Sequence, residues 1–160
     1  MGKLLFATTF LATLGSALMA GLFFTFSNTA MTAFGKLPPV TGIAAMQAIN
    51  VWILNPIFGL VFFGTSVLSV LLIVVAVLNL SQAWAWPLLA GALSYLIGSL
   101  LVTMIFNVPL NDRLAASAAE TAEAASFWDE YLRVWTAWNH VRTVLSLAAT
   151  GLLIWALCRG

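Results

Sequence analysis

The feature that most constrains this chain is a run of 75 residues, from 37 to 111, that contains no Lys, Arg, Asp, Glu or His. A helix that crosses the hydrocarbon core of a bilayer needs about 20 apolar residues, so this run can hold two spanning helices and a connection. Over all 160 residues, 62% are hydrophobic and 7% are charged, whereas soluble proteins have about 45–50% and about 25%. So few charges exclude a soluble globular enzyme, and a net charge of +1 argues against nucleic acid as a partner. The sequence predicts an integral membrane protein.

Four membrane-spanning helices are predicted within a single membrane domain, residues 1–160. They cover approximately residues 4–31, 56–78, 87–106 and 135–157. Asn55 is the expected N-cap of the second helix, which begins at Pro56, and Pro109 is expected to stop the third. Ser126 is the expected N-cap of a long last helix, whose first turns stand outside the hydrocarbon.

The predicted fold class is all-α: a four-helix bundle with up-down topology, in a multi-pass protein of a plasma or inner membrane. Both termini and the turn at residues 79–84 are expected on one side. The longer connections, residues 32–55 and 107–134, are expected on the other side, each with a short extra helical segment. Two sets of small residues predict close helix packing, either within the bundle or at the seam of a homo-oligomer. Ala12, Ser16 and Ala20 recur at four-residue spacing on the first span, and Gly91, Ser94 and Gly98 lie on one face of the third.

Polar side chains gather at the span ends that adjoin the long connections. They come from four stretches of sequence: Thr25, Ser27 and Asn28; Gln47, Asn50 and Asn55; Thr103, Asn107, Asn111 and Arg113; Trp135, Trp138, Asn139, His140 and Arg142. An ionisable side chain inside a spanning helix is costly, which makes Arg142 a candidate functional residue. Because up-down topology brings these ends to one depth, we expect a ligand pocket there. The alternatives are helix capping by the asparagines, an interfacial belt of tryptophans, and an Arg142 that ties down a loop.

The residue types in this set restrict the chemistry. One His and no acidic residue within the spans do not supply the three protein ligands of a zinc or iron site, although haem needs only one axial ligand, such as His140. No phosphate-binding loop and no nucleophile with its base can be assembled. His140 is instead the expected general base, with Arg142 and Asn139 stabilising the resulting oxyanion. The expected substrate-binding residues are Asn50, Asn107, Asn111, Arg113, Trp135 and Trp138.

Four sequence motifs resemble the anthrone oxygenase-like family of small four-span membrane proteins, most of which have no assigned function. The motifs are MQAIN at residues 46–50, NPIFGLVFFG at 55–64, NVPLNDRL at 107–114 and WTAWNHVRT at 135–143. The resemblance extends from about Gly15 to Leu153 and implies a four-helix membrane bundle. Its fungal polyketide-pathway members imply oxidation of an anthrone to an anthraquinone by dioxygen, without metal or flavin. The family's marked positions correspond here to Asn107, Asn111, Arg113, Trp135, Asn139, His140 and Arg142.

Two functions follow as hypotheses. The first is a cofactor-independent oxygenase that uses dioxygen as co-substrate on a lipophilic aromatic or quinol-like small molecule. The second is a non-catalytic membrane protein that binds a lipid, a quinone or a partner helix, with haem binding through His140 as a minor variant. An open cavity among the polar side chains favours the first hypothesis. Side chains that are hydrogen-bonded to one another and closed off favour the second.

Overall fold

The structure is a computed structural model that describes residues 1–160, and all its regular elements are helices. The first rod joins α1 (Lys3–Thr25), the π-helical turn η1 (Phe26–Ala30) and α2 (Met31–Phe34). α3 (Pro39–Trp52) follows, and α4 (Pro56–Leu78) is the second rod. The third rod joins α5 (Ala85–Tyr95), η2 (Leu96–Leu101), η3 (Thr103–Asn107) and α6 (Val108–Ala115), and the fourth is α7 (Ala122–Cys158). All four rods are long and apolar enough to cross a membrane.

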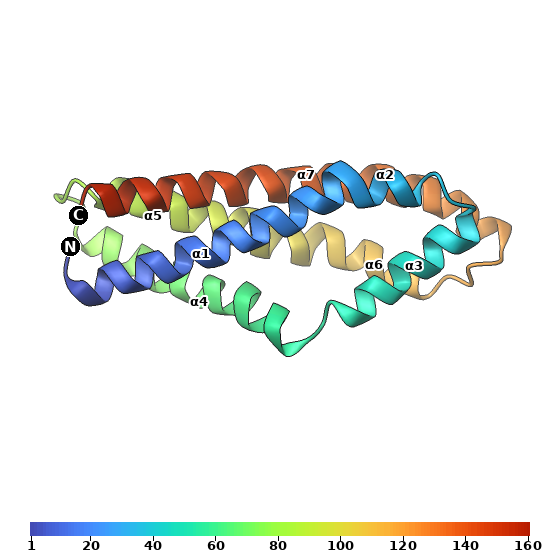
Figure 1. Ribbon diagram of the computed structural model, residues 1–160, viewed down its shortest axis with the longest axis horizontal. Coiled ribbons are helices and arrows are strands. Elements are labelled where there is room, and N and C mark those ends of the chain that lie inside the picture. Colours follow the sequence, from blue (N-terminus) through green and yellow to red (C-terminus); the bar gives the residue numbers. More distant parts are fainter.

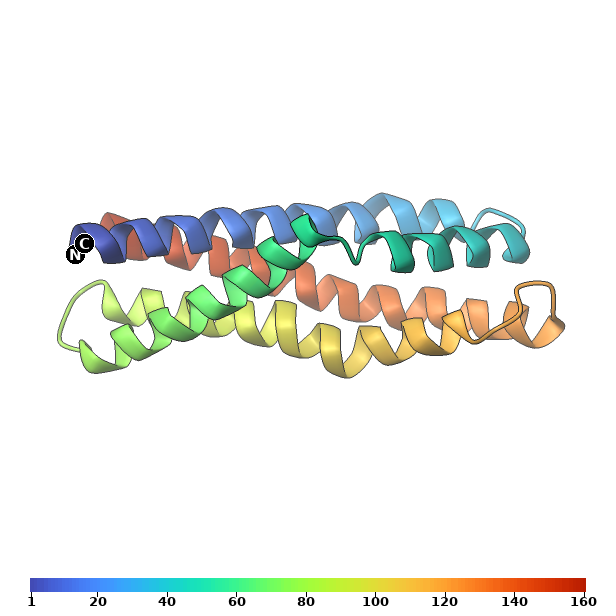
Figure 2. The ribbon, with the colours of Figure 1, turned by 90° about the horizontal axis from the view of Figure 1, so that it is seen from below.

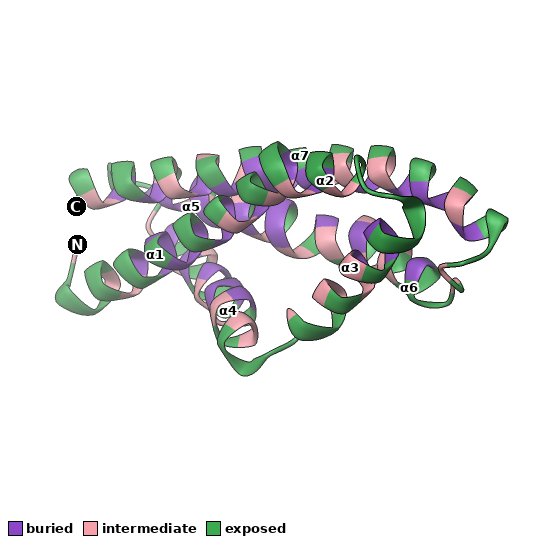
Figure 3. Ribbon diagram, turned by 45° about the vertical axis from the view of Figure 1, so that its right-hand side comes forward, coloured by how far each residue is buried: buried purple, intermediate pink, exposed green.

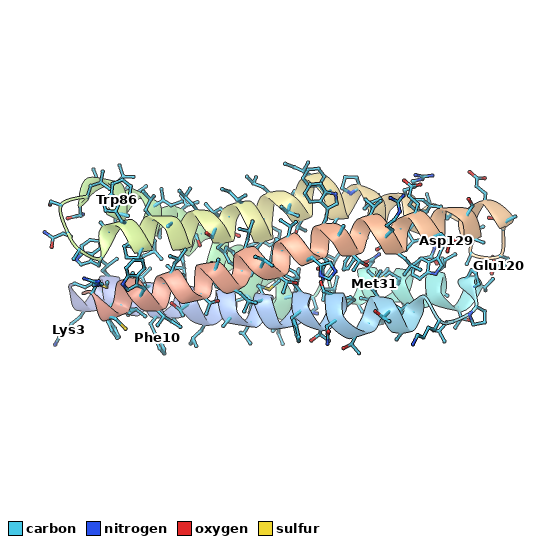
Figure 4. The ribbon with its side chains drawn as sticks, turned by 90° about the horizontal axis from the view of Figure 1, so that it is seen from above. Lys3, Phe10, Met31, Trp86, Glu120 and Asp129 are labelled. Carbon is cyan, nitrogen blue, oxygen red and sulfur yellow. The ribbon has the colours of Figure 1, made fainter.

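The rods alternate in direction, so that both chain ends lie at one end of the molecule (Figure 1). The Met1 amino group donates a hydrogen bond to the Gly160 carbonyl oxygen at 3.2 Å. Figure 4 shows Lys3 and Trp86 at this end, and Glu120 and Asp129 at the opposite end. The up-down four-helix bundle predicted from the sequence is confirmed.

Each rod packs against two neighbours: α7 contacts α1 and α5, and α4 contacts the same two helices. The buried faces turn inward and the exposed faces turn outward along every rod (Figure 3). Ala12, Ser16 and Ala20 are all buried on one face of α1. Their spacing therefore serves packing within the bundle.

Two glycines of the third rod allow α7 to come close. A Cβ atom at Gly91 would lie 3.0 Å from Leu153 Cγ, and one at Gly98 would collide with Leu145 Cβ. Any larger side chain would push the two helices apart, because the interior is close-packed. This glycine face is thus occupied by the chain's own α7.

The third rod continues through Pro109, where the sequence analysis expected it to end. The π-helical segment η3 ends at Asn107, two residues before the proline, and the Val108 amide donates to the Thr103 carbonyl, five residues earlier. A proline in a regular helix meets the carbonyl four residues back, but a π turn widens the backbone at that point and accommodates the ring. The helix consequently runs on to Ala115.

The two long connections differ from each other. α3 is the extra helical segment expected in the first connection, whereas α6 continues the third rod and only residues 116–121 connect it to α7. α7 also begins earlier than predicted, since Thr121 rather than Ser126 is its N-cap. The Thr121 side chain accepts a hydrogen bond from the Ala124 amide at 3.1 Å. Alanines and a glutamate, which are good helix formers, fill this added first turn.

Candidate functional site

A cavity of about 520 Å³ lies where α3 meets α4, between the first rod, the third rod and α7. In Figure 2 this is the region where α4 crosses the bundle and joins α3. Fourteen of its 22 lining residues are hydrophobic. The remaining eight are polar: Gln47, Asn50, Thr103, Asn107, Asn111, Asp112, Asn139 and Arg142. An apolar chamber with a few convergent polar groups is typical of a small-molecule site.

Arg142 is the cation of this chamber. Its side chain is 7% exposed and its Nε atom has no hydrogen-bond partner. The guanidinium carbon lies 3.7 Å from the ring centroid of Phe23 and 5.7 Å from that of Trp135. No acidic side chain forms an ion pair with Arg142. The one ion pair in the structure joins two other residues. A buried cation without an anion favours an anionic or strongly polarised oxygen beside it.

Asn139 is fully buried one turn before Arg142, and its amide is held in one orientation. Its Nδ2 atom donates to the Phe23 carbonyl and to Ser27 Oγ, both at 2.7 Å. Reversing the amide would set its oxygen against the carbonyl oxygen, so the hydrogen bonds decide the assignment. The Oδ1 atom is left without a partner. It is an unused hydrogen-bond acceptor in a residue that lines the cavity.

Asn107 and Asn50 add two more unused polar atoms. The Asn107 Nδ2 atom donates to the Trp135 carbonyl at 3.3 Å, and its Oδ1 atom has no partner. The Nδ2 atom of Asn50 also has none. Four of the five buried unpartnered polar atoms in the protein thus belong to residues that line this cavity. Two are acceptors and two are donors, and such groups are costly to leave unpaired.

Asn111 has a structural role, because its side-chain oxygen already accepts two hydrogen bonds. Its Oδ1 atom accepts from Tyr131 Oη at 2.7 Å and from Trp135 Nε1 at 2.9 Å. These bonds tie α6 to α7 and fix the indole that lies beside Arg142. Among the residues predicted for binding, Asn111 and Trp135 therefore form the wall, and Asn50 and Asn107 present free polar atoms.

His140 is not part of this cavity, and this corrects the sequence-based expectation of a shared chamber. Its side chain is exposed and lies at a separate hollow of about 350 Å³, with Ser27, Asn28 and Thr143 among its lining residues. Successive residues of an α-helix differ by about 100° in direction. Since Asn139 and Arg142 face inward, the intervening His140 faces outward.

Arg113 and Trp138 also lie outside the cavity lining. Arg113 Nη1 is 3.5 Å from Glu130 Oε2 in an exposed ion pair, and its guanidinium covers the Phe127 ring at 3.8 Å. Trp138 stacks on Phe106 with ring centroids 3.6 Å apart. Both residues join α7 to the third rod rather than to a ligand space.

Two residues that contribute to the site escaped the sequence-based assignment. Asp112, exposed at the cavity rim, is its only acidic lining residue, and Phe23 supplies the face that Arg142 covers. Gln47 belongs to the predicted polar set, and its Nε2 atom donates to the Leu114 and Ser117 carbonyls, at 2.8 and 3.0 Å, and so secures α3. Asp112 directly follows a predicted asparagine. No comparable signal marks Phe23 among so many apolar residues.

The structure contains no group of three or more His, Cys, Asp or Glu side chains placed to hold a metal ion. Haem binding through His140 stays a prediction, which an absorption spectrum of the purified protein would test.

Comparison with known proteins gives one match: the family described as Anthrone oxygenase, over residues 56–152. Neither the curated proteins nor the solved structures show a match. The matched segment is more than half of the chain. It includes Asn107, Asn139 and Arg142, but not α1 or α3, which complete the cavity.

Proposed function

The chain belongs to the anthrone oxygenase family, and from this premise we propose that it oxidises a flat, lipophilic aromatic with dioxygen in the cavity beside Arg142. The observation that carries the proposal is the buried guanidinium without an anion, in a residue that lines an otherwise apolar chamber. In such surroundings a fixed positive charge stabilises developing negative charge far better than water does.

The substrate's acidic carbon lies opposite a carbonyl group, as in an anthrone. Removing a proton from that carbon delocalises the electron pair onto the carbonyl oxygen, which becomes an enolate or phenolate oxygen. This oxygen would lie against Arg142 and accept a hydrogen bond from Asn50 Nδ2. Because the interaction strengthens as the charge develops, it lowers the barrier to deprotonation.

The oxidation needs no external reductant. The carbanion gives one electron to dioxygen, and the two radicals combine to form a carbon–oxygen bond and a hydroperoxide once a proton returns. Loss of water, with the second proton from the same carbon, leaves a carbonyl. One oxygen atom ends in the ketone and the other in water, and the four electrons all come from the substrate carbon.

Asp112 is the proton acceptor in this scheme, in place of His140. It is the only carboxylate that lines the cavity, and its exposure at the rim connects it with solvent. A general base must come within hydrogen-bond reach of the proton that it removes. His140, on the outward face of α7, lines a different hollow.

Binding of a quinone, one form of the non-catalytic alternative, matches the unused polar atoms less well. A quinone offers only acceptors, which would leave Asn107 Oδ1 and Asn139 Oδ1 unpaired. A hydroxylated aromatic ketone has both kinds of group, so its hydroxyls could donate to these oxygens while its carbonyl accepts. This complementarity supports a substrate that carries hydroxyl groups in addition to the carbonyl.

The test uses the detergent-purified protein with anthrone and 1,8-dihydroxyanthrone as probes. Oxygen consumption and quinone absorbance report turnover, and substrate-dependent tryptophan fluorescence reports binding. We expect Arg142→Gln to lower kcat by about 100-fold or more. Arg133→Gln is the matched control, since Arg133 is exposed on the same helix. Binding of both probes without any turnover by the wild-type protein would overturn the oxygenase proposal and favour the binding alternative.

A further inference from the structure

The bend between α3 and α4 is a fixed corner with an apolar surface. Asn55 Oδ1 accepts from the Ile57 and Phe58 amides at 3.1 and 3.0 Å, and its Nδ2 donates to the Trp52 carbonyl at 3.1 Å. The large side chains that surround the corner are strongly exposed: Val51, Trp52, Leu54, Ile57 and Leu60. We call this surface the elbow patch. In water, such a contiguous apolar patch would be a liability.

The elbow patch lies at the edge of the hydrocarbon. α4 has 23 residues and no charged side chain, which gives about 34 Å of helix for a core of about 30 Å. Its first residue, Pro56, must therefore sit near one boundary. The neighbouring rods, Ala85–Ala115 and Ala122–Cys158, are 31 and 37 residues long and continue beyond that level. An exposed tryptophan at Trp52 is typical of this interfacial depth.

The cavity reaches the surface at the same place. Val51 and Leu54 of the elbow patch line it, yet they are 68% and 79% exposed. Met104 of η3, on the third rod, also lines it and is 49% exposed. Side chains that belong both to the cavity wall and to the outer surface mark its opening. The rim of this opening is apolar.

We propose that the cavity opens laterally into the bilayer between Leu54 and Met104, and that its ligand arrives from the lipid through this portal. The inference rests on the proposed function only in that the ligand is a lipophilic aromatic. The competing route is aqueous: Asp112 and Ala115 also line the cavity and are exposed on the side of the α6–α7 loop. An apolar ligand dissolved in the membrane is far more concentrated at the first opening than at the second.

The first experiment asks which solvent faces the portal. Cys158 is the only cysteine, so Cys158→Ser provides a background for Leu54→Cys, labelled with bimane in phosphatidylcholine nanodiscs. Val67→Cys on the exposed face of α4 is the lipid control, and Ala116→Cys in the loop is the water control. We expect dibrominated lipid chains to quench the label more strongly than aqueous iodide does, as at Val67. Iodide quenching as strong as at Ala116 would overturn the proposal.

The second experiment asks whether the ligand uses the portal. The Leu54→Cys protein is compared before and after reaction with N-cyclohexylmaleimide, so that one folded sample serves as its own reference. Association of anthrone from phosphatidylcholine vesicles is followed by stopped-flow tryptophan fluorescence. We expect the association rate to fall about tenfold. The same treatment of Val67→Cys should leave the rate unchanged.

An unchanged association rate after blocking Leu54→Cys would overturn the portal, whatever the turnover. Because the readout is binding, it is separate from the oxygenase proposal. A protein that takes up anthrone through the portal without oxidising it would contradict the proposed function but not the portal. A protein that oxidises anthrone, but whose association rate is unchanged after blocking, would contradict the portal and leave the proposed function in place.

Discussion

At the scale of single residues, the site depends on how one amide is oriented. Asn139 presents its oxygen to the cavity because Phe23 and Ser27 occupy both hydrogens of its nitrogen. An asparagine could present either its donor or its acceptor to a ligand, and here the surrounding backbone makes the choice. The hydroxyl of Ser27, buried and far away in sequence, thus acts on the ligand only through Asn139.

Ser27→Ala tests this role. The variant removes one acceptor of the Asn139 nitrogen, and we expect a loss of about 1 kcal/mol in the free energy of unfolding. We also expect the affinity for 1,8-dihydroxyanthrone to fall more than the affinity for anthrone, because the Asn139 oxygen is no longer held in place. Denaturation and binding titrations in detergent give the two quantities. Ser94→Ala, which removes a hydroxyl bonded only to its own helix, should change neither.

Asp112 and His140 provide a second test at this scale. Asp112→Asn should lower kcat by about 100-fold, since it removes the proposed base, while the Kd for the probe stays similar. His140→Ala should retain turnover, because its side chain faces the outer surface of α7. Steady-state oxygen consumption decides between them. Loss of turnover in His140→Ala alone would identify His140 as the general base, as the sequence predicts.

At the scale of elements, close contact between the third rod and α7 sets the position of the site. The contact occurs at Gly98, within the π-helical segment η2, and Asn107 lies further along the same rod. A π turn adds a residue to the helical circuit and rotates every later side chain. The glycine and the widened turns together decide which residues of this rod face the cavity.

Gly98→Ala should therefore destabilise the bundle. A Cβ atom there would overlap Leu145 Cβ, and overpacking of this kind costs about 1–3 kcal/mol. Gly151→Ala is the matched control, because nothing lies within 4 Å of its Cβ position. Alanine is also the better helix former, so this variant should be as stable as the wild type or more so. Thermal unfolding followed by circular dichroism in detergent compares the two, and equal melting temperatures would contradict the packing argument.

At the scale of the whole molecule, the four alternating rods place Cys158 and the α6–α7 loop at opposite ends. Native Cys158 and a cysteine introduced by Gly2→Cys should react with an impermeant maleimide from the same side of sealed vesicles. Ala116→Cys, in the Cys158→Ser background, should react only from the other side. Gel-shift labelling measures this, and labelling of Cys158 and Ala116→Cys from the same side would contradict the topology.

The identity of the membrane and homo-oligomer formation stay predictions, and native mass spectrometry tests the latter.

Much of this architecture was predictable from the sequence. The 75 residues without a charge or histidine determined two spans, and the lengths of the flanking apolar runs determined two more. Asn55 with Pro56 located the start of α4. Hydrophobicity and length are properties of a linear sequence. Because the hydrocarbon core has a fixed thickness and offers no partner for backbone hydrogen bonds, an apolar run of sufficient length forms a spanning helix. Even the level of the polar cluster followed from simple alternation of the rods.

Only the tertiary structure decided which polar residues meet. Asn139 and His140 are neighbours in the sequence, and both are predicted to line the pocket. The rotation of the helix directs Asn139 to the cavity and His140 to the surface. The widened backbone at η3 also carries the third rod past Pro109 and sets the direction of Asn107. A regular period of 3.6 residues does not foresee such a shift. The direction of each side chain depends on contacts between rods, and those contacts exist only after the bundle has formed.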